Sequence, residues 1–174
     1  MIIRKAQPSD AQALSAIGAA SFIETFQHLY AAEDLNAFLA KSHSEQAYLN
    51  LFTNPKNIAW LVEDETDVVG YAVAGVCTLP VPHMPKNSGE LGRLYLLERV
   101  QGNGLGKSLL DLAMDFLTTN FDHIFLSVYA ENIRAQEIYQ SRGFRKVHDY
   151  FYMVGNHADP EWIMKWIGLP KAEV

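Results

Sequence analysis

The chain has 174 residues, of which 49% are hydrophobic and 20% are charged, and this balance indicates a globular protein rather than a disordered one. Its 14 basic and 20 acidic residues give a net charge of −6, which argues against nucleic acid as the main partner because phosphate binding needs a basic face. A charge of this size usually serves solubility, although it also suits a cationic substrate such as an amine.

The single cysteine, Cys77, excludes an internal disulfide and fits a reducing compartment. Because it follows the apolar run 70–76, we expect a buried structural thiol rather than a nucleophile. Residues 1–5 lack the long apolar core of a signal peptide, and no apolar run approaches the ~18 residues that span a membrane. We therefore expect a cytoplasmic protein without a membrane partner, folded as one domain over residues 1–174.

The first half of the chain predicts helices followed by a pair of strands. Ser9 or Asp10 can cap a helix whose apolar side includes Leu14 and Ile17. Two later runs are rich in β-branched and aromatic residues, and the acidic stretch between them is typical of a hairpin. The expected elements are a strand at 2–6, a helix starting at 8–10 that continues into or is closely followed by 22–26, helices at 32–41 and 44–52, strands at 57–63 and 68–77, and a proline-rich loop at 80–88.

The second half alternates strands and helices. We expect a strand at 90–97, a strong helix at 104–119, a strand at 123–129, a helix at 133–141 that Gly143 ends, and strands at 144–154 and 162–167. This order predicts an α/β (α+β) fold, in which helices cover a mixed central sheet.

A glycine-rich turn after the 90–97 strand is the sharpest feature of the sequence. Glycines 102, 104 and 106 open the 104–119 helix, and the free N–H groups and dipole of a helix start favour an anion. Glycine also lets the backbone approach phosphate oxygens closely. We expect a phosphate or pyrophosphate site here; the alternative is a tight turn that merely caps the helix.

The spacing of these glycines excludes two common nucleotide motifs. The pattern is Q-x-x-G-x-G, whereas a P-loop requires G-x-x-x-x-G-K-[ST]. The dinucleotide fingerprint requires G-x-G-x-x-G near the first βα unit, but this turn lies late in the chain, after a predicted antiparallel meander.

This segment, after Leu94-Tyr95-Leu96, resembles the acetyl-CoA signature of the GNAT (GCN5-related) N-acetyltransferase superfamily. A second block, 132–144, matches the family's N-x-x-A-x-x-x-Y-x-x-x-G-F segment in the expected order and spacing. The resemblance covers most of the chain and is weakest at 42–54 and 80–89. It implies the GNAT fold, with a mixed sheet of about seven strands splayed between strands 4 and 5, helices on both faces, and acetyl-CoA as the cosubstrate.

By this resemblance the cofactor lies in the V between the 90–97 and 123–129 strands. Backbone groups of Leu94, Tyr95 and Leu96 would hold the pantetheine, and amides of the glycine loop would hold the pyrophosphate. Asn132 can also be simply the N-cap of the 133–141 helix. The implied cofactor-binding residues are Leu94, Tyr95, Leu96, Gln101, Gly102, Asn103, Gly104, Leu105, Gly106, Lys107, Ser108, Asn132 and Tyr139.

Acyl transfer to an amine requires two proton-handling groups, because a protonated amine has no lone pair and a departing thiolate must be stabilised or protonated. The family's position for the acid is Tyr139, whose hydroxyl has a reference pKa of about 10, close to a thiol at about 8.5. The base position corresponds to Glu90. The alternatives are a core aromatic for Tyr139 and a surface carboxylate for Glu90. No metal is needed, and the six histidines show no ligand spacing.

The acceptor pocket in this fold is built from the N-terminal helices, the loop before the central strand and the last strands. The 21–26 segment resembles bacterial spermidine/spermine N-acetyltransferase-like members, and Tyr30, His83 and Tyr150 lie in the same regions. Glu24 would pair with a cationic acceptor. The alternative for Glu24 is a surface carboxylate, and the alternative for each aromatic candidate is a core residue. The substrate-binding candidates are Phe22, Glu24, Phe26 and Tyr152.

The function implied is transfer of an acetyl group from acetyl-CoA to the primary amine of a small molecule, with polyamines among the candidates. Three alternatives stay open: acetylation of a protein or peptide amine, a CoA-binding regulatory module without catalysis, and a phosphate-binding kinase. The kinase is disfavoured because the P-loop lysine pattern and a carboxylate pair for Mg²⁺ are missing. The resemblance also implies that a homodimer can form through the final strands and the tail Lys171–Val174.

Overall fold

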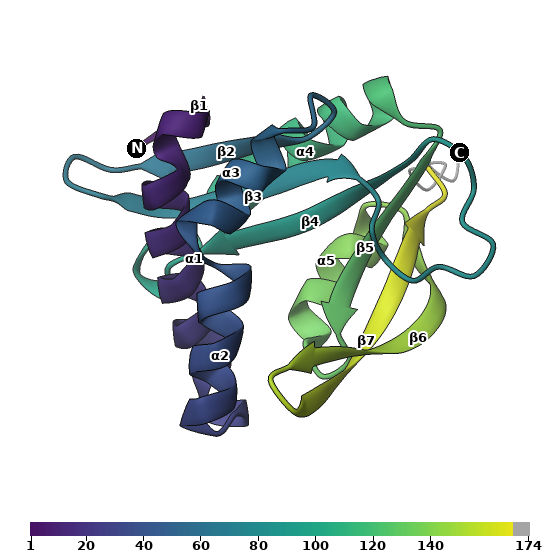
Figure 1. Ribbon diagram of the computed structural model, residues 1–174. Coiled ribbons are helices and arrows are strands. Elements are labelled where there is room, and N and C mark those ends of the chain that lie inside the picture. Colours follow the sequence, from purple (N-terminus) through teal and green to yellow (C-terminus); the bar gives the residue numbers. More distant parts are fainter. Residues whose placement is uncertain (169–174) are drawn as a thin grey trace.

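A computed structural model describes residues 1–168 and arranges them as a seven-stranded sheet with helices on both faces (Figure 1). The strands are β1 (Ile2–Lys5), β2 (Ile58–Glu63), β3 (Val68–Val76), β4 (Ser88–Leu96), β5 (His123–Tyr129), β6 (Phe144–Val154) and β7 (His157–Trp166). The helices are α1 (Ala11–Phe26), α2 (Ala32–Ser42), α3 (Glu45–Phe52), α4 (Leu105–Asn120) and α5 (Ile133–Ser141), with short 3₁₀ turns η1 (Pro8–Asp10), η2 (Gln27–Leu29) and η3 (Glu98–Val100).

The strand order is β1-β2-β3-β4-β5-β7-β6, and the one parallel pair among these strands is β4 with β5. Their pairing is short: it runs from Ser88 opposite His123 to Leu91 opposite Leu126. Beyond that point the two strands separate, and Figure 1 shows them diverging from their common end at the upper right. The predicted mixed sheet, splayed between its fourth and fifth strands, is confirmed.

A bulge in β4 coincides with the point of divergence. The register with β3 passes directly from Leu91 to Arg93, so Gly92 is an extra residue in β4. An extra residue bends a strand and shifts its side-chain alternation by one position. The shift explains why Leu91 and Leu94 pack into the same core, and it turns Glu90 and Arg93 together toward the opposite face.

Strand alternation divides the apolar side chains between two cores. On β2, Ala59 and Leu61 pack with α1 and α3, whereas Ile58, Trp60 and Val62 pack with α4 on the other face. Figure 1 shows α1, α2 and α3 gathered on one side of the sheet. Helices thus cover both faces of β2, whereas β6 at the far edge of the sheet leaves Phe151 and Met153 exposed.

The last strand begins earlier than the sequence pattern predicts. We expected a strand at 162–167, but β7 starts at His157, directly after a tight turn in which Gly155 has φ of +58°. Pro160 stays in register with Phe151 of β6, and its carbonyl accepts a hydrogen bond from the Ala130 amide at 2.9 Å, so the strand continues through the proline. The other predicted elements are present, with bounds that differ by one or two residues and with a 3₁₀ turn in place of the first turn of α1.

None of the helices within residues 1–168 is both long and apolar enough to cross a membrane. The tail Lys171–Val174, which we expected to help pair two copies, lies outside the described residues.

Candidate active site

A cavity of about 1160 Å³ lies where β4 and β5 part. The loop before α4 and one side of α5 line it from one face of the sheet. Residues of α1 and of the β6–β7 hairpin line it from the other face. A ligand in this cavity can therefore be contacted from both sides of the split sheet.

The glycine-rich loop forms one end of the cavity. Gly102 and Gly104 have φ of +82° and +79°, and Gly104 is the N-cap of α4. A Cβ built at either residue would meet no atom within 4 Å, so the left-handed backbone conformation, not crowding, demands glycine here. The first amides of α4 have no partner within the helix, and this open cradle suits a phosphate.

The loop residues predicted to bind the cofactor divide into two groups. Asn103 is exposed, Leu105 packs against the α4 core, and the Ser108 hydroxyl donates to the carbonyl of Gly104 at 3.3 Å. These three residues do not line the cavity. The ones that do are Gln101, Gly102, Gly104, Gly106 and Lys107.

The open edge of β4 supplies the next part of the wall. Leu94, Tyr95 and Leu96 pair with β3 on one side, and their other edge faces the split because pairing with β5 ends at Leu91. Backbone groups along an unpaired edge can bind an extended ligand such as a pantetheine arm. The Gln101 side chain donates to the Leu96 carbonyl at 3.1 Å and so ties the glycine loop to the end of the strand.

We expect Gly104→Val to weaken acetyl-CoA binding by about tenfold, because a β-branched residue pays roughly 1–2 kcal/mol in the left-handed conformation and relaxes by distorting the cradle. The matched control is Gly168→Val. Gly168 also has positive φ, +95°; a Cβ at this position would meet no atom within 4 Å, and the residue does not line the cavity. Isothermal titration with acetyl-CoA should separate the two variants; equal affinities would contradict the role of the loop.

Helix α5 is fixed against the end of β5 by two polar side chains. Asn132 Oδ1 accepts a hydrogen bond from the Ala135 amide at 3.1 Å, so Asn132 is the N-cap, and it also lines the cavity. Buried Gln136 donates to the carbonyls of Tyr129 and Ala130 at 3.1 and 2.9 Å. These bonds set the position of the rest of the helix, including its cavity-facing side.

Tyr139 of α5 has a partly buried ring and a hydroxyl without a protein partner among the described residues. The ring packs edge-on against Phe144, with centroids 6.0 Å apart, and joins the α4-side core. The residue lines the cavity, and its hydroxyl makes no hydrogen bond to any other described residue. Burial raises the pKa of Tyr139 to about 12, so the hydroxyl keeps its proton at neutral pH and can act only as a donor or a neutral acceptor.

Glu90 lies on the opposite wall, at the closed end of the split. Its Oε2 accepts hydrogen bonds from the amide and the hydroxyl of Thr78, at 2.8 and 3.2 Å. Burial raises the pKa of the Glu90 carboxyl, and the Thr78 bonds act in the opposite direction. The second carboxylate oxygen, Oε1, makes no hydrogen bond to a described residue and is available to a ligand.

A second, half-buried carboxylate, which the sequence did not single out, belongs to Glu161 of β7. The Tyr150 hydroxyl lies 3.0 Å from Glu161 Oε2 and 2.8 Å from Ser127 Oγ, which links three strands by hydrogen bonds. Burial raises the pKa of Glu161 to about 7, the Tyr150 bond lowers it, and the charges of Asp159 and Glu90 raise it further. The cavity therefore holds a carboxyl group that titrates near neutral pH.

Asp159, two residues earlier on β7, is also buried and lines the cavity. Its Oδ2 accepts a hydrogen bond from the Tyr30 hydroxyl, which joins the hairpin to the turn after α1. Because the last strand was expected to start at residue 162, the sequence did not place Asp159 and Glu161 on a strand. Had the turn at 155–156 been recognised, the period of two along β7 would have placed Asp159 and Glu161 on one face.

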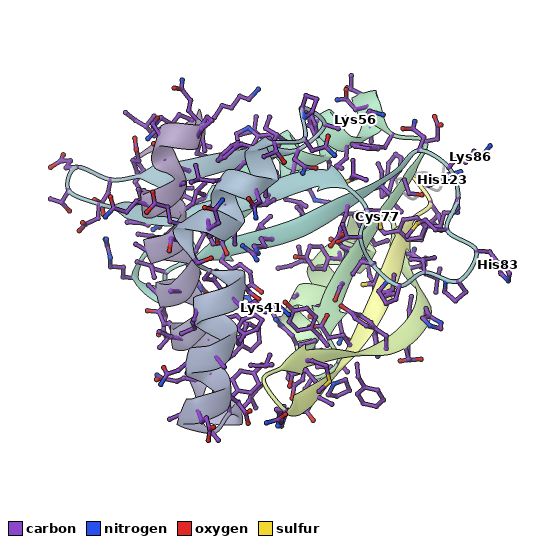
Figure 2. All side chains as sticks on the ribbon, in the orientation of Figure 1. Lys41, Lys56, Cys77, His83, Lys86 and His123 are labelled. Atoms are coloured by element: carbon purple, nitrogen blue, oxygen red, sulfur yellow. The ribbon has the colours of Figure 1, made fainter. Side chains whose placement is uncertain are left out.

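The predicted acceptor-binding residues are only partly brought together. Phe22, Phe26 and Tyr152 line the cavity and form an aromatic group with neighbouring rings. Glu24 does not line it; its carboxylate accepts a hydrogen bond from the Glu98 amide at 2.7 Å and holds the start of η3. His83, from the loop before β4, points away from the cavity (Figure 2).

A buried cation, Arg93, lies beneath the aromatic group. Its guanidinium donates to the Ser42 carbonyl at 2.9 Å and lies 5.1 Å from the centre of the Tyr48 ring. The Tyr48 hydroxyl bonds to Nδ1 of His43, at 3.0 Å, and burial lowers the pKa of His43 to about 3. His43 is therefore neutral, and Arg93 is held in place by a carbonyl and a ring face rather than by a carboxylate.

Charge is distributed unevenly along the cavity. At the glycine-loop end it is lined by Lys107, Arg134 and Arg142, of which Arg142 pairs with Asp111 at 2.6 Å. The acidic groups Glu90, Asp159 and Glu161 lie on β4 and β7. One end of the cavity thus favours an anionic ligand and the other a cationic one.

Cys77 is half-buried, and burial raises the pKa of its thiol to about 12. A thiol that stays protonated at neutral pH is a poor nucleophile, which supports the structural role expected for it.

The chain matches the family model "Acetyltransferase (GNAT) family" over residues 23–144. It is 25% identical over 151 residues to an uncharacterized N-acetyltransferase of Lactobacillus delbrueckii subsp. lactis, covering 86% of this chain and 87% of that protein. It is 35% identical over 85 residues to the spermine/spermidine N(1)-acetyltransferase of Bacillus subtilis, covering 47% of this chain and 55% of that protein.

The fold is also similar to that of solved structures. The PaiA N-acetyltransferase of Thermoplasma acidophilum, in a complex with coenzyme A, superposes with a TM-score of 0.72 at 20% identity, covering 95% of this chain and 97% of that one. A ribosomal-protein-alanine N-acetyltransferase from Brucella melitensis gives a TM-score of 0.65 at 21% identity, covering 95% and 98% of the two chains.

Proposed function

This chain belongs to the GNAT acetyltransferase family, and on that basis we propose that it transfers the acetyl group of acetyl-CoA to the primary amine of a small cationic molecule by direct attack in a ternary complex. One observation carries the proposal: a single cavity has a phosphate cradle at one end, a protonated tyrosine along its wall, and buried carboxylates at the far end.

The residues at the glycine-loop end fit coenzyme A. The positive φ of Gly102 and Gly104 leaves open space where side chains would stand, and the start of α4 offers free amides to the pyrophosphate. Lys107 adds a positive charge beside them. The open edge of β4 would pair with the amides of the pantetheine arm, and this would direct the thioester toward the split.

Bound acetyl-CoA supplies an activated acetyl thioester. In our proposal Glu90 accepts the proton of the incoming ammonium at Oε1, directly or through one water, because Glu90 lines the cavity and this oxygen makes no hydrogen bond to a described residue. The raised pKa makes the Glu90 carboxylate a stronger base than an ordinary glutamate. Thr78 fixes the carboxylate through the other oxygen.

Tyr139 would hold its proton toward the sulfur as the C–S bond breaks. Its pKa of about 12 lies above the reference value of a thiol, about 8.5, but burial in the same cavity also raises the pKa of the departing thiol. A strong hydrogen bond to the developing thiolate then stabilises the transition state without full transfer beforehand.

The acidic end of the cavity supports a small cationic acceptor. An aromatic wall that includes Phe22, Phe26 and Tyr152 would cover the methylene chain of an alkylamine, and aromatic faces also attract ammonium groups. The partial identity to the B. subtilis spermine/spermidine acetyltransferase supports polyamine-type acceptors. The cytoplasmic location and the homodimer stay predictions, and β6 offers an edge strand for the latter.

The test combines binding with turnover. We expect acetyl-CoA at a hundred times its Kd to stabilise the folded protein by about 2.7 kcal/mol, which raises Tm by several degrees, whereas NAD leaves Tm unchanged. We then expect acetyl transfer to polyamines to exceed transfer to amino acids and to peptide N-termini, measured by release of free CoA. Binding without turnover on any amine would favour a regulatory module, and a preference for peptides would favour a protein substrate.

A further inference from the structure

We propose that Asp159 forms a subsite for a second ammonium group of the acceptor, so that the enzyme prefers short diamines and polyamines to monoamines of the same length. This inference rests on the proposed acetylation of small amines. It goes further because it names the group that recognises the far end of the acceptor and the spacing at which it does so.

The Asp159 carboxylate is incompletely satisfied by the protein. The residue is only 4% exposed, and its Oδ2 accepts from the Tyr30 hydroxyl. Its Oδ1 is buried and receives no hydrogen bond from any described residue. A buried carboxylate oxygen without a donor is costly, and an ammonium group would bring both donors and a positive charge.

One basic side chain lies within ion-pair distance of this oxygen but donates no hydrogen bond to it. His157 Nε2 lies 3.2 Å from Asp159 Oδ1, but the two atoms do not have hydrogen-bond geometry, and the His157 side chain is 44% exposed. The imidazole packs edge-on against Tyr30, with centroids 5.3 Å apart. His157 therefore occupies the solvent side of the carboxylate, and the cavity side is left for a ligand.

Strand geometry sets the distance between this subsite and the reacting end. Asp159 and Glu161 are two residues apart on β7, so their side chains share a face and are separated by about 7 Å along the strand. This separation is comparable to the distance between the two nitrogens of a three- or four-carbon diamine. One amine would lie near Glu161 and Glu90, next to the split, while the other binds Asp159.

The surroundings of this line of carboxylates suit an alkyl diamine. Tyr30 and Phe26 line the cavity beside the hairpin, and they offer ring faces to methylene groups and to cations. The Arg93 guanidinium does not neutralise the carboxylates by pairing, because it is bound to the Ser42 carbonyl and lies over the Tyr48 ring. Arg93 therefore forms no ion pair with Asp159, and the second ammonium would supply the cation that pairs with it from the cavity side.

The test is the ratio of kcat/KM for butane-1,4-diamine to that for butylamine, at saturating acetyl-CoA. We expect a ratio of about 30 in the wild type, and a ratio close to one in Asp159→Asn, because truncating one partner of a buried charge pair costs that factor or more. Because both substrates are measured with the same variant, a general loss of activity cancels in the ratio. The control, Asp149→Asn, changes an exposed carboxylate of β6 that pairs with Lys146 at 2.7 Å, and should keep the wild-type ratio.

Two further variants keep the test decisive if Asp159→Asn folds poorly. Tyr30→Phe removes the hydrogen bond to Oδ2 but keeps the charge, so the diamine preference should persist. Asp159→Glu lengthens the side chain by one methylene and should shift the preference toward propane-1,3-diamine. An unchanged ratio in both Asp159 variants would overturn the subsite. If the wild type acetylates butylamine and butane-1,4-diamine equally, the Asp159 subsite is overturned, but the proposed acetyl transfer still stands. If the wild type acetylates no amine, both proposals are overturned.

Discussion

Replacing Tyr139 with phenylalanine is expected to lower kcat by about a hundredfold, the range observed for loss of a general acid. The departing sulfur would then lack the one protonated hydroxyl that our proposal provides for it. The loss should be largest at neutral pH and smaller once the pH exceeds the pKa of the departing thiol, which burial raises above its reference value of about 8.5, because a thiolate then needs no proton to leave. Steady-state kinetics across this pH range would show both effects.

The same substitution should leave binding and stability nearly unchanged, because the Tyr139 hydroxyl makes no hydrogen bond to a described residue and the ring keeps its contact with Phe144. A matched control is Tyr71→Phe. The Tyr71 hydroxyl is also without a partner, but it is buried in the α1-side core and does not line the cavity. If Tyr139→Phe turns over like Tyr71→Phe, Tyr139 is not the acid.

Replacing Glu90 with glutamine is expected to lower kcat/KM at neutral pH by about a hundred- to a thousandfold, because the amide cannot accept the ammonium proton. Glutamine keeps the size of the side chain, and its carbonyl can still accept the two hydrogen bonds from Thr78, so the fold should be retained. The measurement is acetyl transfer to a fixed amine, with acetyl-CoA affinity determined in parallel.

The pH dependence identifies which carboxyl group acts as the base. A carboxyl base works only when ionised, so activity is lost as pH falls through its pKa; since the pKa of Glu90 is raised, this loss should occur above the ordinary range of glutamate. Glu161, whose pKa is raised to about 7, adds a nearby negative charge. Glu161→Gln should therefore move the acid limb to lower pH and cost less than tenfold in kcat/KM.

The reverse result would reassign the base. If Glu161→Gln abolishes the acid limb and Glu90→Gln only shifts it, then Glu161 accepts the proton and Glu90 tunes it. Glu137→Gln, an exposed carboxylate on α5, should leave the profile unchanged and controls for net charge.

Local patterns of the sequence predicted most of the secondary structure. The 104–119 helix and the strand pattern at 123–129 correspond to α4 and β5, because their apolar periods persist over enough residues to decide between helix and strand. The glycine loop was also predicted from the sequence, because only glycine adopts positive φ at low cost and two such positions lie directly before a helix. For Asn132 the sequence predicted cofactor binding, with a helix cap as the alternative; its side chain is found in the cap role, and its contact with the cofactor stays a prediction.

The acceptor end of the cavity was poorly predicted from the sequence. Glu24 reads as a cation-binding residue, but the fold uses its carboxylate to hold the backbone of Glu98, 74 positions away. Asp159 and Glu161 were missed because the last strand was expected to start at residue 162, whereas β7 starts at His157 and is held by pairing with β6 and β5. Contacts of this kind join residues that are far apart in the sequence, so no local pattern predicts them.

The sequence by itself therefore determined the family resemblance, the mixed sheet and the glycine loop at the start of α4, because each of these depends on backbone conformation and periodicity within a short segment. The tertiary structure alone decided which charges share the cavity. The bulge at Gly92 turns Glu90 and Arg93 to the same face, and the β6–β7 hairpin brings Glu161 opposite them. Desolvation by the surrounding strands then raises the pKa values of both carboxyl groups, and burial of this kind is a property of the assembled fold.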